Sequence, residues 1–239
     1  MLFYYIRHGD PIYEPDSLTP LGMRQAEAVG RRLAEFGLDK IYASTSERAV
    51  LTSKPACELL HLEAELLDFA NETYAYRELT INRASDGKKG WLFHSADGRQ
   101  ILTNPQLRAL GYKWYEHESI AKYNFAKGIA RIADNADALF ARLGYEHERY
   151  SGRYKAVSPN KKRVALFAHQ GFGIAFLSHV LDIPYPYFAL NFDMTHTGVT
   201  VIEFPDDGEY SFPRILTYSD MSHIYREGLC ALYNKRIKI

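Results

Sequence analysis

Reactive side chains stand where apolar runs of the chain end. Arg7 and His8 directly follow one such run, Arg48 lies shortly after a second, and His169 closes a third, while Asp68 opens an acid-bearing stretch. Guanidinium groups present planar forks of donors that match phosphate oxygens, and a neutral imidazole is a competent covalent nucleophile. Together these groups would suit the transfer of a doubly negative phosphoryl group, which depends on positioning and charge stabilisation.

Such a reaction also needs a proton donor for the leaving oxygen, and a carboxylic acid near the pocket would serve. The stretch "LLDFANETYAYREL" offers Glu72 and Glu78, with Asp68 as a more distant choice. The residues alone leave these alternatives open.

The elements that must position these groups alternate between strand and helix over the first seventy residues. Apolar or aromatic strands are predicted at 2–6, 40–44 and 63–69. A helix is predicted over 20–36, with Thr19 as N-cap, Pro20 at the first helical position and Gly37 closing it. Its predicted apolar positions are Met23, Ala26, Val29, Leu33 and Phe36. A second helix follows Ser46, and Pro55 puts its continuity in doubt.

The alternation lapses between about residues 70 and 160. A polar, glycine-bearing stretch is followed by a long amphipathic helix within 119–144, for which Gly144 is the predicted stop. The strand and helix pattern then resumes with an almost unbroken apolar strand over 163–169, of the kind buried on both faces. We therefore predict one domain over residues 1–239 with an insertion or cap at about 70–160.

The predicted fold class is α/β, with a three-layer, doubly wound and mostly parallel sheet and helices on both faces. In such a sheet the carboxyl ends of the strands form one rim, where ligands bind. Strands more than a hundred residues apart, such as those ending at His8 and His169, can therefore contribute to a single site.

Four motifs occur in order: "IRHGDP", "LTPLGMRQA", "YASTSERAVLT" and "FAHQGF". In order and spacing they resemble the signatures of the histidine phosphatase superfamily, also called the phosphoglycerate mutase-like family. The resemblance covers about the first seventy residues and 163–204. It implies that His8 is the phosphorylated nucleophile, that Arg7 and Arg48 bind the phosphate, and that His169 is the second pocket histidine. It also implies that water hydrolyses the phosphohistidine without a metal or other cofactor.

The same resemblance favours Glu72 over Glu78 as the general acid, because Glu72 follows the strand-end aromatic at a spacing similar to that in relatives. It also places Gln170 beside the pocket, where it would contact substrate. His196 precedes a strand whose counterpart in the family borders the pocket.

The resemblance implies a phosphatase acting on a small phosphorylated substrate. Glycolytic mutases carry a longer loop after the RHG tripeptide, whereas here only "DPIYEPDS" intervenes before the next motif. Two alternatives remain open: phosphoglycerate mutase-type phosphoryl transfer, and a non-catalytic module that binds a phosphorylated ligand.

Composition restricts the partners. The chain has 29 basic and 29 acidic residues and a formal charge of zero, so no field of the whole molecule favours nucleic acid or an acidic membrane surface. No basic leader or membrane-length apolar run is present in the sequence, which indicates a cytoplasmic protein. Cys57 and Cys230 are expected to be reduced thiols packed as small apolar groups. The sequence does not indicate an oligomeric state.

Two secondary features have competing interpretations. The segment 70–160 is rich in tyrosine, and its first half carries cations that could select a substrate or simply face solvent: Lys88, Lys89, Arg99, Arg108 and Lys113. The tetrapeptide "YEHE" occurs at 115–118 and 145–148, which suggests a metal site, but the copies flank a long helix. We therefore predict solvated helix-end residues there, no metal ligands, and structural roles for His61, His179 and His223.

Overall fold

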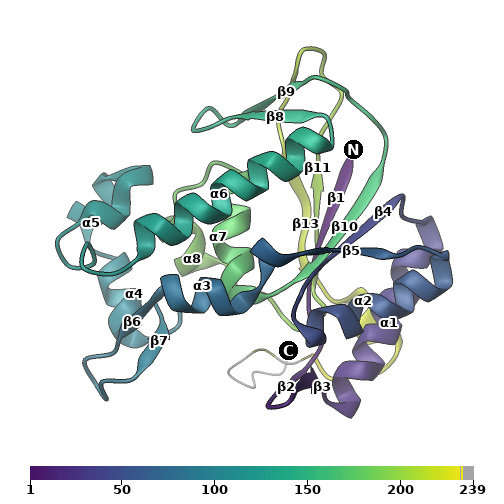
Figure 1. Cartoon of the computed structure of the whole chain (residues 1–239), viewed down its shortest axis with the longest axis horizontal. Helices are drawn as coiled ribbons and strands as arrows, with labels where there is room; N and C mark the ends of the chain where they lie inside the picture. The colour runs from purple at the N-terminus through teal and green to yellow at the C-terminus, as the bar shows by residue number, and fades with distance from the viewer. Residues whose placement is uncertain (232, 234–239) are drawn as a thin grey trace.

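The computed structural model describes residues 1–231 and 233. Its centre is a six-stranded sheet with the order β13-β11-β1-β10-β4-β5 (Figure 1). Parallel pairing joins β1 to β10, β10 to β4 and β4 to β5, and antiparallel pairing adds β11 and β13 at one edge. The predicted α/β class with a mostly parallel sheet is confirmed. The strands are β1 (Leu2–Arg7), β4 (Lys40–Ser44), β5 (Ala64–Leu67), β10 (Arg163–Ala168), β11 (Val199–Glu203) and β13 (Arg214–Asp220).

Strand β1 shows how the sheet separates two cores. Its side chains alternate between the faces, so that Phe3 and Tyr5 enter one apolar cluster and Ile6 enters the other. Strand β1 lies between β10 and β11, and its Tyr5 pairs with Leu166 of β10 and with Thr200 of β11. A strand buried on both faces reads as a continuous apolar run, which explains the sequence "LFYYI".

Helices cover both faces of this sheet. Helices α1 (Pro20–Phe36) and α2 (Glu47–Leu60) pack on each other and on one face, while α6 (Phe125–Arg142) and α7 (Gln170–Val180) lie across the other (Figure 1). Helix α7 is apolar and almost entirely buried, as expected for a helix between the sheet and α6.

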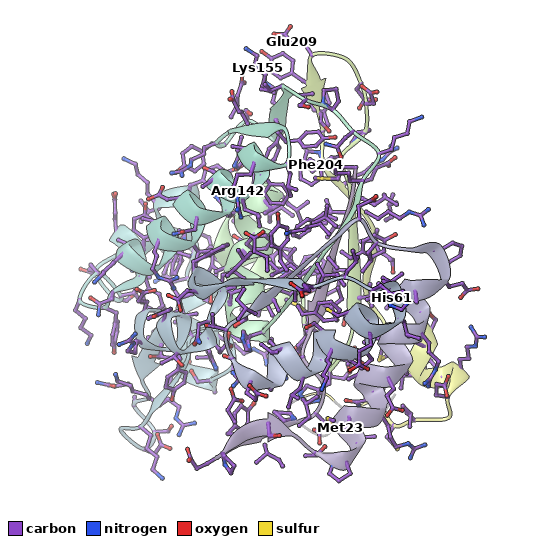
Figure 2. All side chains as sticks on the ribbon, turned by 45° about the vertical axis from the view of Figure 1, so that its right-hand side comes forward. Met23, His61, Arg142, Lys155, Phe204 and Glu209 are labelled. Carbon is purple, nitrogen blue, oxygen red and sulfur yellow. The ribbon has the colours of Figure 1, made fainter. Side chains whose placement is uncertain are left out.

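The first helix begins and ends as predicted. Thr19 accepts a hydrogen bond from the backbone N–H of Gly22, Pro20 is its first residue, and Gly37 follows with φ of 75°. The predicted apolar face was wrong at its two ends, because Met23, which Figure 2 labels, and Phe36 are exposed, by 45% and 71% respectively. The buried apolar residues of α1 are the central ones, including Ala26, Val29 and Leu33.

Helix α2 continues through Pro55 without a break. The doubt about its continuity was therefore wrong. Close packing against α1 accompanies this proline, because a Cβ at Gly30 would lie 2.8 Å from the Pro55 Cβ. Cys57 on this helix and Cys230 are free thiols, but Cys230 is exposed rather than packed as an apolar group.

The segment between β5 and β10 forms several short elements around α6. They are η1 (Asp68–Ala70), α3 (Glu72–Glu78), β6 (Thr80–Asn82), β7 (Lys89–Trp91), α4 (Ala96–Leu102), α5 (Pro105–Ala109), η2 (Gly111–Glu116), β8 (Tyr145–Glu148) and β9 (Arg153–Ala156). Buried Trp114 stacks on Tyr185 of α8 (Tyr185–Asn191), with ring centroids 4.8 Å apart. The segment therefore shares one core with α8; its description as an insertion stays a prediction.

The second "YEHE" copy is a strand, not a solvated helix end. It forms β8, which pairs with β9, and the His147 side chain is fully buried. The predicted stop at Gly144 is confirmed, since α6 ends at Arg142 and Gly144 has a φ of 96°. The prediction for His147 failed because the chain continues from Gly144 directly into β8, which packs against α6 instead of facing solvent. The remaining elements are the hairpin β2 (Pro11–Tyr13) and β3 (Asp16–Leu18), β12 (Tyr210–Ser211) and α9 (Ser222–Arg226).

Aromatic rings fill the space between α6 and the sheet. Phe204, labelled in Figure 2, lies with its ring centroid 4.9 Å from that of Phe140 and 5.1 Å from that of Tyr145. Within the described part of the chain, no helix is both long and apolar enough to span a bilayer.

Candidate active site

His8 lies one residue beyond the end of β1, at the carboxyl rim of the sheet, and is 3% exposed. Its Nδ1 is 2.7 Å from the carbonyl oxygen of Gly9. Because a carbonyl can only accept, the proton is on Nδ1 and the lone pair is on Nε2. Burial, together with the charges of nearby groups such as Arg7 and Arg48, holds the pKa of His8 well below its usual value, so the ring is neutral at pH 7.

Gly9, the residue after His8, lies in close contact with α1. The φ angle of Gly9 is not positive. A Cβ at this position would lie 2.7 Å from the carbonyl oxygen of Gly22 in α1, so a larger residue would not fit. The backbone N–H of Gly9 donates to Thr52 Oγ1 of α2 at 3.0 Å, and Thr52 donates in turn to the carbonyl of Arg48 at 2.6 Å. The turn after His8 is thereby tied to the helix that carries Arg48.

Arg7 is the last residue of β1 and is 1% exposed. Its guanidinium donates to the carbonyl oxygen of Met194 at 2.6 Å. This bond joins the end of the central strand to the loop that precedes β11.

Arg48 lies in the first turn of α2 and is nearly buried. It pairs with Asp16 of β3 at 2.7 Å and lies over the Tyr13 ring at 5.5 Å. Its Nε is buried without a hydrogen-bond partner. The β2-β3 hairpin therefore orients Arg48 and leaves a donor available to an anion.

His169 follows β10, on the strand next to β1, and its ring centroid is 5.2 Å from that of His8. Its Nε2 is 2.8 Å from Ser44 Oγ at the end of β4, and its Nδ1 is buried without a hydrogen-bond partner. Tyr5 Oη donates to the His169 carbonyl at 2.5 Å. Burial first, and then Arg48 and Arg7, hold the pKa of His169 well below its usual value.

Glu72 begins α3, just past the end of β5. Its Oε1 accepts the backbone N–H of Gly171 at 3.0 Å and its Oε2 accepts that of Phe172 at 3.1 Å. Burial raises the pKa of Glu72, although the Phe172 hydrogen bond and Arg48 act in the opposite direction. A carboxyl group with a raised pKa beside a neutral imidazole is suited to donate a proton.

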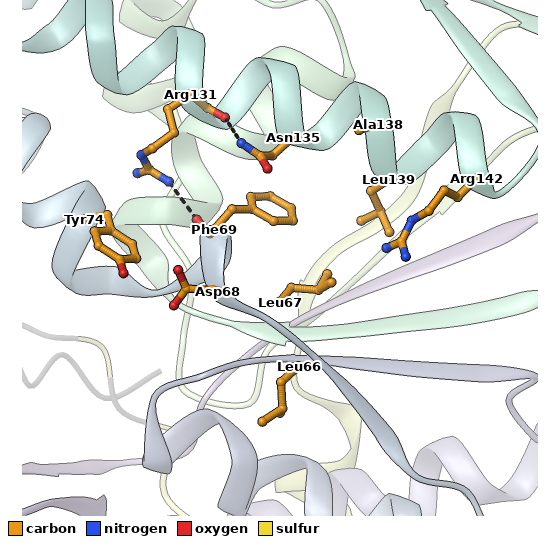
Figure 3. A pocket seen from close by; sticks show the side chains of 10 residues that line it. All are labelled: Leu66, Leu67, Asp68, Phe69, Tyr74, Arg131, Asn135, Ala138, Leu139 and Arg142. Carbon is orange, nitrogen blue, oxygen red and sulfur yellow. Dashed lines mark hydrogen bonds between the residues drawn. The ribbon is translucent and has the colours of Figure 1, made fainter.

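The other two acids lie elsewhere. Glu78 accepts two hydrogen bonds from Arg131 of α6, at 2.9 and 2.7 Å. Asp68 lines a separate cavity of about 530 Å³ between η1 and α6, where Arg131 also donates to the Phe69 carbonyl (Figure 3). Of the three candidate acids, the structure brings only Glu72 to the histidines.

A cavity of about 400 Å³ opens over these groups. It is lined by Arg7, His8, Tyr13, Arg48, Glu72, Thr73, Tyr76, Trp91 and Gln170. The carboxyl ends of β1, β4, β5 and β10 supply its charged and titratable groups, directly or through the residues that follow them. The structure thus places Arg7, His8, Arg48, His169, Glu72 and Gln170 around one cavity, with His169 beneath the lining.

Gln170, the first residue of α7, is held by its own partner. Its side-chain amide donates to Asp193, which also accepts the backbone N–H of Met194 at 2.7 Å. The amide is therefore oriented by the same loop that Arg7 contacts.

Sequence reasoning missed three aromatic lining residues: Tyr13, Tyr76 and Trp91. Trp91 and Tyr76 meet edge to face with ring centroids 5.3 Å apart. Trp91 also lies so close to Gly171 that a Cβ on that glycine would overlap its ring. For Tyr76 and Trp91 the richness of the segment 70–160 in aromatic residues was the available signal, but it did not single out which of them face the cavity. No signal in the sequence pointed to Tyr13.

The cations noted in that segment do not line this cavity, whose described cationic lining residues are Arg7 and Arg48. His196 does approach the site, with its ring centroid 5.7 Å from that of His8 and its Nδ1 3.5 Å from Asp10. Burial, followed by the charge of Arg7, lowers the pKa of His196 to about 2. His223 contacts Thr197 Oγ1 at 3.1 Å, which fits the predicted structural role.

Comparison with known proteins agrees with this architecture. The family model for the histidine phosphatase superfamily (branch 1) matches residues 3–88, which confirms the resemblance indicated by the sequence motifs. A search of curated proteins finds no match.

Solved structures share the fold over nearly their whole length. Phosphoserine phosphatase from Entamoeba histolytica, in complex with 3-phosphoglyceric acid, is 18% identical with a TM-score of 0.58, covering 93% of this chain and 98% of that one. A mycobacterial glucosyl-3-phosphoglycerate phosphatase is also 18% identical with a TM-score of 0.58, covering 92% of this chain and 99% of the other.

Proposed function

From this similarity to the histidine phosphatase superfamily and the site geometry, we propose that the protein is a phosphatase that hydrolyses a phosphomonoester through a phosphohistidine on His8. The observation that carries the proposal is the state of the His8 ring. Its Nδ1 proton is engaged by the Gly9 carbonyl at 2.7 Å, and its pKa is lowered. The remaining nitrogen, Nε2, is therefore a neutral nucleophile among cationic groups.

The first step transfers the phosphoryl group. His8 Nε2 forms a bond to phosphorus while the bond from phosphorus to the ester oxygen breaks, and Glu72 supplies a proton to the departing alcohol. Arg7, Arg48 and His169 would stabilise the charge on the equatorial oxygens. Support comes from the unpartnered nitrogens of Arg48 and His169, both buried beside the cavity.

The second step regenerates the enzyme. Glu72, now ionised, accepts a proton from water as the water oxygen attacks phosphorus, and the bond to His8 Nε2 breaks. Inorganic phosphate leaves, and His8 returns to its neutral form. None of these steps as proposed uses a metal.

The residues that line the cavity over His8 suggest which kind of alcohol is the leaving group. Tyr13, Tyr76 and Trp91 surround the cavity, and its described cationic residues, Arg7 and Arg48, are assigned to the phosphate. We therefore propose a phosphomonoester whose alcohol portion is apolar or aromatic and packs against these rings.

Hydrolysis of aryl and alkyl phosphates in the presence of a chelator tests the function. We expect release of inorganic phosphate that is insensitive to the chelator and is lost in His8→Ala. Transfer of phosphate to an added phosphoglycerate instead of water would indicate a mutase. Tight phosphate binding without turnover of any phosphomonoester would indicate a binding module.

A further inference from the structure

A second cluster of histidines and carboxylates lies away from the cavity over His8. Asp137 of α6, His147 of β8 and His179 of α7 turn one ligand atom each toward a common point. Asp137 Oδ1 is 2.9 Å from His147 Nδ1 and 2.6 Å from His179 Nε2, and the two nitrogens are 3.3 Å apart. Three elements, the consecutive α6 and β8 and the more distant α7, thus supply two nitrogens and one oxygen.

The ring of His147 is oriented by a second carboxylate. Its Nε2 lies 3.1 Å from Asp182 Oδ2, which also accepts the backbone N–H of Gly152 at 2.8 Å. The carboxylate fixes a proton on Nε2, so the neutral tautomer directs the Nδ1 lone pair at Asp137 and His179. A histidine that binds a metal through one nitrogen commonly donates its other N–H to a carboxylate in this way.

The spacing of the three atoms suits a small divalent cation. Zinc binds histidine nitrogen and carboxylate oxygen at about 2.0–2.2 Å, which separates neighbouring ligands of a tetrahedral site by about 3.3–3.6 Å. The observed separations of 2.6, 2.9 and 3.3 Å are as short or shorter, and they leave a point at bonding distance from all three atoms. Two imidazoles and one carboxylate are ligands typical of zinc and related transition metals.

The cluster of Asp137, His147 and His179 is accessible to an ion and lies apart from the His8 site. The side chain of His147 is fully buried, whereas those of His179 and Asp137 are 10% and 21% exposed. His179 and Asp182 line a cavity of about 210 Å³ from which an ion and a water ligand could enter. His179 lies nine residues beyond Gln170 on α7, or about 13 Å along the helix, so the cluster is at the opposite end of α7 from the His8 site.

We propose that Asp137, His147 and His179 form a binding site for a divalent transition-metal cation such as Zn²⁺, with Asp182 as the positioning residue for His147. The ion would link α6, β8 and α7 behind the phosphatase site and would take no part in hydrolysis. The prediction that the chain contains no metal ligands, and the purely structural role assigned to His179, would then be wrong.

Metal titration of the full chain tests this proposal. Protein freed of metal with a chelator is titrated with Zn²⁺ by calorimetry, and separately with Co²⁺ by absorption spectroscopy. We expect one equivalent of Zn²⁺ to bind, Co²⁺ to give visible d–d bands that Zn²⁺ abolishes, and Zn²⁺ to raise the melting temperature.

Variants assign the ligands. His179→Gln and Asp137→Asn should lose the stoichiometric binding and the Co²⁺ bands, whereas His61→Gln at the exposed end of α2 should keep both. Asp182→Asn, which tolerates the positive φ of 49° at that position, should weaken binding by about 10- to 100-fold.

Circular dichroism establishes that each variant is folded. Absence of Zn²⁺ binding by the wild-type chain would overturn the proposal and leave the cluster as a proton-bridged network of ion pairs. Equal binding by folded His179→Gln would overturn it as well. Neither result bears on the phosphatase, which is assayed with chelator present.

Discussion

The carboxylate of Glu72 accepts the backbone N–H of Gly171 at 3.0 Å, which ties the first residue of α3 to the first turn of α7. The bond fixes the carboxyl group two residues from His169 at the rim of the sheet. Because burial also raises the pKa of Glu72, a protonated fraction can persist at a pH where an exposed glutamate is ionised.

Glu72→Gln should therefore impair protonation of the leaving group. We expect kcat/KM for an alkyl phosphate to fall by about 10²- to 10⁴-fold, the usual contribution of general acid catalysis. The kcat/KM for p-nitrophenyl phosphate should fall much less, because nitrophenolate leaves without protonation. Steady-state kinetics with both substrates measures the difference.

Glu78→Gln provides the matched control, since Glu78 pairs with Arg131 outside the cavity. It should retain nearly all activity on both substrates. Equal losses for the alkyl and aryl phosphates in Glu72→Gln would contradict a role in proton donation.

The pH dependence of kcat/KM should have two limbs. His8 must be neutral, and its lowered pKa places the acidic limb below the ordinary histidine value of about 6.5. Glu72 must be protonated, and its raised pKa places the basic limb above the ordinary value of about 4.3. Activity should therefore decline on the basic side as Glu72 ionises.

Comparing the wild type with Glu72→Gln on the same alkyl phosphate removes the contribution of substrate ionisation. The kcat/KM of the wild type divided by that of Glu72→Gln should be largest at low pH and fall as pH rises. A ratio independent of pH would exclude Glu72 as the titrating acid.

Trp91 should contribute to recognition of the alcohol portion. Trp91→Ala is expected to raise KM for aryl phosphates by about 3- to 10-fold, the equivalent of one favourable aromatic contact. The inhibition constant of inorganic phosphate should not change, because phosphate is assigned to the arginines. Trp91→Phe should recover part of the affinity.

Phe212→Ala is a suitable control because Phe212 is 51% exposed and does not line the cavity. A parallel increase in KM and in the phosphate inhibition constant for Trp91→Ala would show distortion of the pocket instead of a lost substrate contact.

Thr52→Val should destabilise the turn that carries His8. The variant leaves the Gly9 N–H, 3.0 Å from Thr52 Oγ1, without its acceptor. An unpartnered buried donor costs about 1–3 kcal/mol, which denaturant unfolding can measure. Thr103→Val removes a comparable hydroxyl at the exposed residue that follows α4 and should change stability by less than about 0.5 kcal/mol. A Thr52→Val variant as stable as Thr103→Val would refute the tie between α2 and the turn.

Much of the fold was predictable because local signals and tertiary structure agree. Thr19, Pro20 and Gly37 specify the ends of α1, and the apolar run before Arg7 specifies a strand buried on both faces. The convergence of His8 and His169 follows from parallel strand topology, since the carboxyl ends of neighbouring parallel strands share one rim.

The remainder depends on contacts that no local pattern encodes. Trp91 reaches the cavity because Gly171 lacks a side chain in its path, a relationship across eighty residues of sequence. His147 resembled a helix-end residue until the chain reversal at Gly144 placed it in a buried strand facing His179. The resemblance favoured Glu72 over Glu78, but the pairing of Glu78 with Arg131 of α6, away from the cavity, could not be predicted from the sequence.

Trapping the covalent intermediate tests the central claim most directly. The enzyme is mixed with a phosphomonoester, quenched in alkali, where phosphohistidine persists, and digested for mass spectrometry. We predict one added phosphoryl group on the peptide containing His8 in the wild type and in greater amount in Glu72→Gln, if loss of Glu72 slows hydrolysis of the intermediate more than its formation. The group should be absent in His8→Ala. Turnover by folded His8→Ala, or a phosphoryl group on another residue, would contradict the mechanism.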